Sequence, residues 1–177
     1  PRQALDAGIG TVYQDLALVP LMSVARNFFM GREPTKQLLG FLPVMDHALA
    51  AETAGTKLRD MGIRIRDANQ MVGTMSGGEK QCLAIARAIH FGAKVLILDE
   101  PTAALTEVES VALFRVLHDL KAQGIGIVYI SHRMAEIFAH GDRVTVLRDG
   151  RDVHCGELSA LNPDALVRAM VGRDLGH

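Results

Sequence analysis

The stretch Val95-Leu96-Ile97-Leu98-Asp99-Glu100 joins four apolar residues to two acids, and Pro101-Thr102 follow it. A short apolar run that ends at a turn predicts a strand buried on both faces, as in the parallel sheets of α/β proteins. Ligands bind such sheets beyond the carboxyl ends of the strands, where Asp99 and Glu100 fall. Because successive side chains of a strand point to opposite faces, the two acids should differ in role. Either Asp99 holds Mg²⁺ and Glu100 faces an attacking water, or a core strand simply stops at a polar turn.

Length and composition favour one domain with a core of its own. The chain has 177 residues, of which 49% are hydrophobic, and its net charge is −1. This near-neutral charge gives no indication of a nucleic-acid surface. Cys82 and Cys155 are far apart in sequence without metal-ligand spacing, so we expect ordinary small side chains in a reduced, cytosolic protein. No apolar run of the sequence approaches the roughly 20 residues of a membrane span.

A second informative stretch is Met75-Ser76-Gly77-Gly78-Glu79-Lys80-Gln81, which leads into a run with helical apolar spacing. Ser76 and Glu79 form a capping box, which predicts the start of a helix. Two glycines directly after the cap are poor helix formers, but they would let a ligand approach the backbone closely. Free N–H groups and the positive end of the helix dipole suit a phosphate. The alternative is only a well-capped helix.

Three further core strands are expected, at residues 9–13, 127–130 and 144–147, and a small strand at 152–155. Gln14 directly follows the first of them. His132 comes just after the second, and there it would share a rim with Asp99 and Glu100, although a structural histidine explains an isolated His better. Helices are expected at 1–7, from 23 towards Gly31, at 48–61, after Ser76, at 106–122, at 134–139 and at 162–172, with loops at 32–45 and 63–73 and a hairpin turn at Asp149-Gly150.

Together these motifs resemble those of an ATP-binding cassette (ABC) ATPase in order and spacing, over essentially the whole chain. Tyr13-Gln14 is similar to the Q-loop and Met75 to Glu79 to the signature motif. Val95 to Glu100 is similar to Walker B and Ser131-His132 to the switch histidine. Finer detail resembles the ATPases of monosaccharide importers for ribose, xylose or fructose, in the segments Thr11-Val12-Tyr13-Gln14, 99–106, 127–134 and Met170-Val171-Gly172-Arg173.

The resemblance implies that ATP and Mg²⁺ are the cofactors and assigns roles to individual residues. The implied nucleotide-binding residues are Gln14, Ser76, Gly77, Gly78 and Glu79. The implied metal ligands are Asp99 and Gln14, and the implied catalytic residues are Glu100 and His132. Within these sets, Ser76 to Gly78 would grip the γ-phosphate of ATP held by an opposite half. Glu100 would polarise the attacking water, while His132 would contact the γ-phosphate.

Two departures from the family pattern stand out. Thr106 stands where the family usually has Asp, a change that the sugar importers often share. No Gly-x-x-x-x-Gly-Lys-Ser/Thr occurs in the 177 residues, so neither the backbone cradle nor the lysine for the β- and γ-phosphates is among them. The aromatic residue that usually stacks on adenine is missing as well. In the family both lie ahead of the Q-loop, so we expect a chain truncated at its N-terminus that alone neither binds nor hydrolyses ATP.

The expected fold is an α/β, P-loop NTPase-type core of the ABC ATPase kind with an inserted helical subdomain. The core would comprise residues 1–19 and 93–177, and the subdomain, residues 20–92, would carry the signature motif. The expected function is that of the ATP-hydrolysing subunit of a sugar importer, peripheral on the cytoplasmic face of the membrane. Its partners would be a transmembrane permease, a second ATPase half or subunit and, indirectly, a periplasmic or extracellular sugar-binding protein, but no nucleic acid.

Two other functions stay open. One is a non-catalytic half that only lends its signature motif to a partner. The other is a soluble ABC protein of translation or DNA repair, which would need a second motif set, basic linkers or a long coiled coil, and the sequence shows none of these. Within the transport hypothesis, the apolar loop Leu16 to Val19 and the helix after Ser23 would form the groove for a permease helix, unless they merely pack between subdomains.

Overall fold

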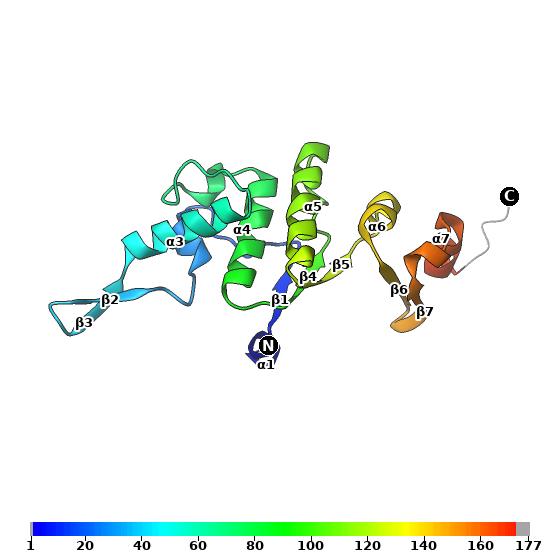
Figure 1. The fold of residues 1–177 in the computed structure, drawn as a ribbon, viewed down its shortest axis with the longest axis horizontal. Coiled ribbons are helices and arrows are strands. Elements are labelled where there is room, and N and C mark those ends of the chain that lie inside the picture. The colour runs from blue at the N-terminus through cyan, green and yellow to red at the C-terminus, as the bar shows by residue number, and fades with distance from the viewer. Residues whose placement is uncertain (1, 173–177) are drawn as a thin grey trace. The chain divides into compact units, whose positions relative to one another are not determined.

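The structure is a computed structural model that describes residues 2–172. The chain divides into two compact units, residues 1–130 and 131–177, whose elements are drawn in Figure 1. Pro1 and Arg173, which belong to the predictions for the two ends of the chain, lie outside the described residues. No helix between residues 2 and 172 combines the length and the apolar character needed to cross a bilayer.

The first unit is built on a three-stranded parallel sheet with the order β1-β4-β5. Its strands are β1 (Ile9–Val12), β4 (Val95–Asp99) and β5 (Gly126–Ile130). Val12 pairs with Leu98, and Asp99 pairs with Ile130. The carboxyl ends of all three strands therefore lie at one edge of the sheet, as the sequence predicts for Gln14 and the two acids.

Five helices accompany this sheet: α1 (Arg2–Asp6), α2 (Val24–Phe28), α3 (His47–Asp60), α4 (Gly77–His90) and α5 (Glu107–Ala122). Helices α4 and α5 pack side by side, α4 also contacts β1, and α5 also contacts β5 (Figure 1). Both begin with a complete capping box, which the sequence predicts at Ser76 and which recurs at Thr106. A short 3-10 helix, η1 (Val72–Thr74), precedes α4.

The sheet is not buried evenly on its two faces. Leu96 and Leu98 are fully buried, whereas Val95 and Ile97 of the same strand are only half-buried. Two side chains of β5 are also exposed to solvent: Val128 is 48% exposed and Ile130 is 46% exposed. The prediction that the central strand is buried on both faces is therefore wrong for the described residues. A continuous apolar run does not distinguish a strand covered on both faces from one covered on a single face.

The segment at residues 32–45, predicted as a loop, contains a β-hairpin instead. Strand β2 (Thr35–Leu38) pairs antiparallel with β3 (Leu42–Met45). The turn between them has positive φ angles at Leu39 and Gly40, 55° and 78°. Asn-Gly or Asp-Gly would have indicated such a turn, but a leucine at its first position did not.

The second unit contains α6 (Met134–His140), β6 (Arg143–Arg148), β7 (Arg151–Glu157), η2 (Leu158–Ala160) and α7 (Pro163–Val171). The hairpin turn predicted at Asp149-Gly150 is confirmed, with φ angles of 52° and 73°. The strand predicted at 144–147 is also confirmed. In the described residues, however, it pairs with β7 and not with the three-stranded sheet.

Candidate functional site

The two acids lie where β4 ends, and the backbone there is strained. Asp99 is the last residue of β4, and Glu100 follows it with a left-handed φ of 47°. Non-glycine residues seldom adopt this conformation, and such outliers cluster at functional sites. The Glu100 N–H donates to the carbonyl of Ile130 at 2.9 Å, so the end of β5 holds the backbone of Glu100 in place.

A buried threonine fixes the turn that follows the acids. Thr102 is fully buried, and its hydroxyl lies 3.3 Å from the hydroxyl of Tyr129 on β5. The N–H of Ala103 donates to the carbonyl of Glu100 at 3.1 Å, and that of Leu105 donates to the carbonyl of Thr102 at the same distance. The path from the acids to α5 is therefore set by the neighbouring strand as well as by its own turns.

Gln14 shares the edge of the sheet with the acids. It comes two residues after β1 ends, and it is exposed. Because β1 lies next to β4 and Val12 is level with Leu98, Gln14 and Asp99 belong to the carboxyl ends of neighbouring strands, at the same edge of the sheet. Carboxylate and amide oxygens are ligands that Mg²⁺ accepts. The oxygen set at this edge fits Mg²⁺, with Asp99 and Gln14 as the residues that could hold it.

The start of α4 has the capping geometry that the sequence predicts. The Glu79 N–H donates to the Ser76 hydroxyl at 3.3 Å, and the Ser76 N–H donates to the Glu79 carboxylate at 2.7 Å. The two glycines between them lie against the start of α5. A Cβ on Gly77 would lie 3.0 Å from the Leu105 side chain, and a Cβ on Gly78 would lie 3.1 Å from that of Glu109. Close packing against Leu105 and Glu109 is therefore a second reason for glycine at positions 77 and 78, besides the close approach of a ligand.

Glu109 is a residue of this site that the sequence analysis did not single out. Its carboxylate accepts hydrogen bonds from the N–H of Thr106 at 3.0 Å, from the N–H of Gly78 at 3.1 Å and from the Thr106 hydroxyl at 2.8 Å. These bonds, followed by a weaker one from the Ser76 side chain, lower the pKa of Glu109 from 4.5 to about 2. Spacing from Thr106 indicates the capping role, but nothing in the sequence indicates the contact with Gly78.

The low pKa of Glu109 has a defined consequence for stability. A carboxyl whose pKa is lower in the folded than in the unfolded state stabilises the fold when it is ionised. The contribution is complete above the unfolded value of 4.5 and is lost as the pH falls through about 2. Near neutral pH, Glu109 is therefore a fixed negative charge at the start of both α4 and α5.

His132 belongs to the other unit. It comes two residues after β5 ends and two before α6 begins. Its expected contact with a γ-phosphate bound near Asp99 stays a prediction. The structure brings together Ser76 to Glu79 with the start of α5, and it places the strand before Gln14 next to the strand that carries Asp99.

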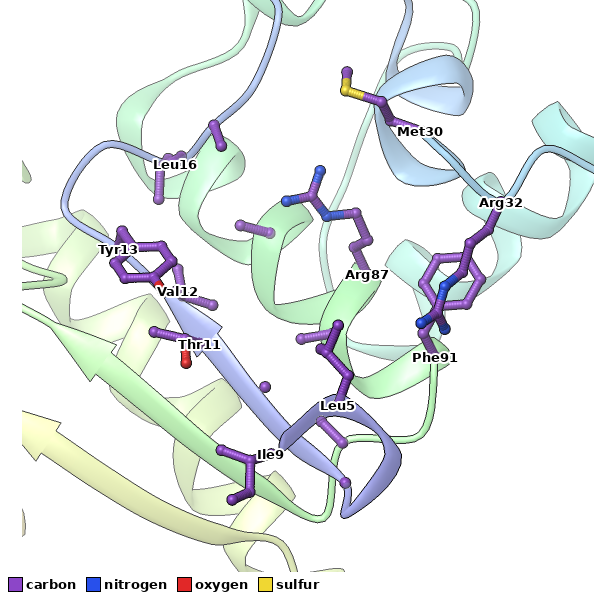
Figure 2. A pocket seen from close by; sticks show the side chains of 16 residues that line it. Leu5, Ile9, Thr11, Val12, Tyr13, Leu16, Met30, Arg32, Arg87 and Phe91 are labelled. Atoms are coloured by element: carbon purple, nitrogen blue, oxygen red, sulfur yellow. The ribbon is translucent and has the colours of Figure 1, made fainter. Parts of the chain in front are cut away.

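A cavity of about 260 Å³ lies next to β1, and Leu16 and Ala17 of the loop after Gln14 form part of its wall. Figure 2 shows Arg87 reaching into the space between Tyr13 and Leu16 on one side and Met30 on the other. Arg32 stacks on the Phe91 ring, 4.9 Å from its centroid. Partial burial lowers the pKa of Arg87. None of the described residues that line this cavity is acidic; its side chains are mostly apolar, with two arginines and the hydroxyls of Thr11 and Tyr13.

The predicted groove differs in detail from this cavity. Leu16 and Ala17 line it, while Leu18 does not; both Leu16 and Leu18 pack in part against the core. Helix α2 buries Val24 and Phe28 in the core, and the wall beyond it is formed by Met30 and Arg32. The loop after Gln14 therefore does reach an open surface, whereas the helix after Ser23 mainly serves the core.

Comparison with known proteins identifies the family. The ABC transporter family model matches residues 1–103. The chain is 44% identical over 176 residues to "Ribose import ATP-binding protein RbsA" of Geobacillus kaustophilus (strain HTA426), covering 99% of this chain and 35% of the relative. It is 42% identical over 175 residues to "Putative ribose/galactose/methyl galactoside import ATP-binding protein" of Pseudomonas syringae pv. syringae (strain B728a), covering 99% of this chain and 32% of the relative. The chain thus spans about a third of the length of these relatives.

Solved structures show the same fold. A dimeric post-hydrolysis state of the ATP-binding cassette MJ0796 with ADP and Pi matches with a TM-score of 0.65 and 25% identity, over 85% of this chain and 62% of that one. The ADP conformation of the cassette MJ1267 matches with a TM-score of 0.74 and 23% identity, over 98% and 72%. The α/β fold expected from the sequence is confirmed, and the chain belongs to the ABC transporter family.

Proposed function

We propose that this 177-residue chain forms part of the ATP-hydrolysing subunit of an ABC sugar importer. The observation that carries the proposal is the edge of the sheet, where the chain carries Gln14, Asp99 and Glu100 at the carboxyl ends of neighbouring parallel strands. The curated relatives add the substrate class, because their names include ribose or galactose import. The subunit would lie on the cytoplasmic face of the membrane, bound to a transmembrane permease and supplied indirectly by a sugar-binding protein.

The chemistry expected at this edge is water attack on a phosphate. Asp99 and Gln14 would hold Mg²⁺, which supplies positive charge against the phosphate oxygens when ATP is bound. The Glu100 carboxylate would orient the attacking water and accept its proton. His132 would donate a hydrogen bond to the γ-phosphate. Phosphoryl transfer depends mainly on positioning and charge, so these residues need correct placement more than covalent reactivity.

The start of α4 would serve a different nucleotide, held by a second ATPase half or subunit. The Ser76 hydroxyl and the N–H groups of Gly77 and Gly78 lie at the positive end of a 14-residue helix. Such a helix start suits a phosphate. Sharing the contacts between two halves would make hydrolysis depend on their closure.

A chimera tests this function. Residues 1–177 would replace the matching 35% of RbsA from Geobacillus kaustophilus, and ribose uptake and ATP hydrolysis would be measured in cells and membranes that lack the native protein. We expect both activities to be present and to fall at least about tenfold with Ser76→Ala, because one phosphate donor is lost. The matched control is Ser23→Ala, which also removes a helix cap. A folded, membrane-bound chimera without ATP hydrolysis would contradict the proposal.

A second prediction concerns coupling to the permease. In the same chimera, Met30→Asp should reduce ribose uptake at least about tenfold and leave basal ATP hydrolysis within about twofold, because a charge in an apolar docking surface disfavours the partner helix. Met30 lines the cavity of Figure 2 and is 36% exposed. Met71→Asp is the control, since Met71 is 54% exposed and does not line this cavity. Unchanged uptake in Met30→Asp would exclude this surface as the docking groove.

A further inference from the structure

We propose that Glu109 is a further residue of the nucleotide site, which competes with the γ-phosphate for the donors at the start of α4. The inference rests on the proposed function, because that function assigns these donors to a phosphate. It concerns a side chain of α5 that contributes its carboxylate from 31 residues further along the chain than Gly78.

The number of hydrogens available at the donors is the first argument. A backbone N–H and a serine hydroxyl each have one hydrogen to donate. The Gly78 N–H already donates to Oε1 of Glu109 at 3.1 Å. The Ser76 side chain lies near enough to help lower the pKa of the Glu109 carboxyl. A phosphate that binds the Gly78 N–H must therefore take this donor from Glu109 or share it on poorer terms.

Charge gives the second argument. The hydrogen bonds from Thr106, Gly78 and Ser76 keep Glu109 ionised at neutral pH. A phosphate at the same donors would lie within a few ångströms of this carboxylate, and like charges at that distance repel appreciably even near a solvated surface. An ionised Glu109 next to Gly78 therefore opposes the phosphate, whereas a neutral side chain of the same size would not.

The two carboxylate oxygens have different partners, which allows one to leave while the other stays. Oε2 accepts from both the N–H and the hydroxyl of Thr106, at 3.0 and 2.8 Å. Oε1 accepts from Gly78. A combined change of the side-chain torsions that pivots the carboxylate about Oε2 would release Gly78 and keep the cap of α5. Binding of a phosphate at α4 would then reorient the carboxylate that caps Thr106.

The experiment uses the 177-residue chain labelled with ¹⁵N and inorganic phosphate as the probe, with the amide signals of Ser76, Gly77 and Gly78 followed by NMR. We expect Glu109→Gln to bind phosphate at these amides at least about fivefold more tightly than the unmodified chain, because the repelling charge is gone. Glu107→Gln is the matched control, since it removes the same charge from the first turn of the same helix. It should change the affinity less than twofold.

A second variant separates charge from reach. Glu109→Asp keeps the charge and the capping chemistry but is one methylene shorter, so the contact with Gly78 should be lost. We expect the Gly78 amide to exchange with solvent faster and phosphate binding to tighten less than in Glu109→Gln. If Glu109→Gln does not fold, Glu109→Asp still tests whether Glu109 competes with phosphate for the Gly78 N–H.

The outcomes distinguish this inference from the function on which it rests. Equal phosphate binding in the unmodified chain and in Glu109→Gln, or weaker binding in the variant, would overturn the competition while leaving the phosphate role of α4 intact. Phosphate that shifts none of the three amides in any variant would overturn the competition together with the phosphate role of α4, while the roles assigned to Asp99 and Glu100 are tested separately in the chimera. Tighter phosphate binding in Glu109→Gln, but not in Glu107→Gln, supports both the competition and the phosphate role of α4. If Glu109 only kept the start of α4 in shape, its replacement would weaken phosphate binding instead.

Discussion

Glu100→Gln in the RbsA chimera should lower the turnover number for ATP by about 10²–10⁴-fold, the range typical of a lost general base. The amide keeps the size of the carboxylate but cannot accept a proton from the attacking water. Nucleotide binding should persist, because Asp99 and Gln14 would still hold Mg²⁺. Steady-state ATP hydrolysis and equilibrium binding of labelled Mg-ATP, measured on the same preparations, check the two halves of this expectation.

Two comparisons make the result specific to the assigned roles. Asp99→Asn should weaken Mg²⁺-dependent nucleotide binding itself, since it replaces a carboxylate metal ligand by a neutral amide. Glu107→Gln, which removes the same charge from the exposed first turn of α5, should leave both measurements unchanged. Normal hydrolysis by Glu100→Gln would show that the division of labour between the two acids is wrong.

Elements with strong local patterns could be predicted from the sequence. The capped starts of α4 and α5 rest on side chains three residues apart, Ser76 with Glu79 and Thr106 with Glu109, so local chemistry alone defines them. The parallel order of the strands follows from short apolar runs that alternate with helices. These patterns also put Gln14 and the two acids at one edge.

Contacts between distant segments could not be predicted. The hydrogen bond from Gly78 to Glu109 joins two helix starts that only the packing of α4 against α5 brings together. The burial of Thr102 depends on Tyr129 of the neighbouring strand. The sequence places Asn27 on a helix with apolar spacing, and nothing there shows that its side chain is directed at a loop.

Asn27 holds that loop, which follows Gln14. It is fully buried, and its Oδ1 accepts a hydrogen bond from the N–H of Val19 at 2.8 Å. Its Nδ2 donates to the carbonyls of Val19, Met22 and Ser23, at 3.0 to 3.2 Å. The carbonyls of Val19, Met22 and Ser23 also accept backbone N–H groups, so Asn27 reinforces an existing turn, and it ties the segment beside the cavity to α2.

Asn27→Ala should therefore lower the free energy of unfolding of the 177-residue chain by about 2–4 kcal/mol, because it removes four side-chain hydrogen bonds, deprives the Val19 N–H of its acceptor and opens a small cavity. Chemical denaturation with urea measures the change. Asn69→Ala is the control: Asn69 is exposed and its side chain bonds only locally, to Asp67, so its cost should stay below about 1 kcal/mol. Equal costs for the two variants would mean that the loop after Gln14 does not depend on Asn27. With the expected result, the amides of residues 16–22 should also exchange faster in Asn27→Ala, since the wall of the cavity next to β1 loses its anchor.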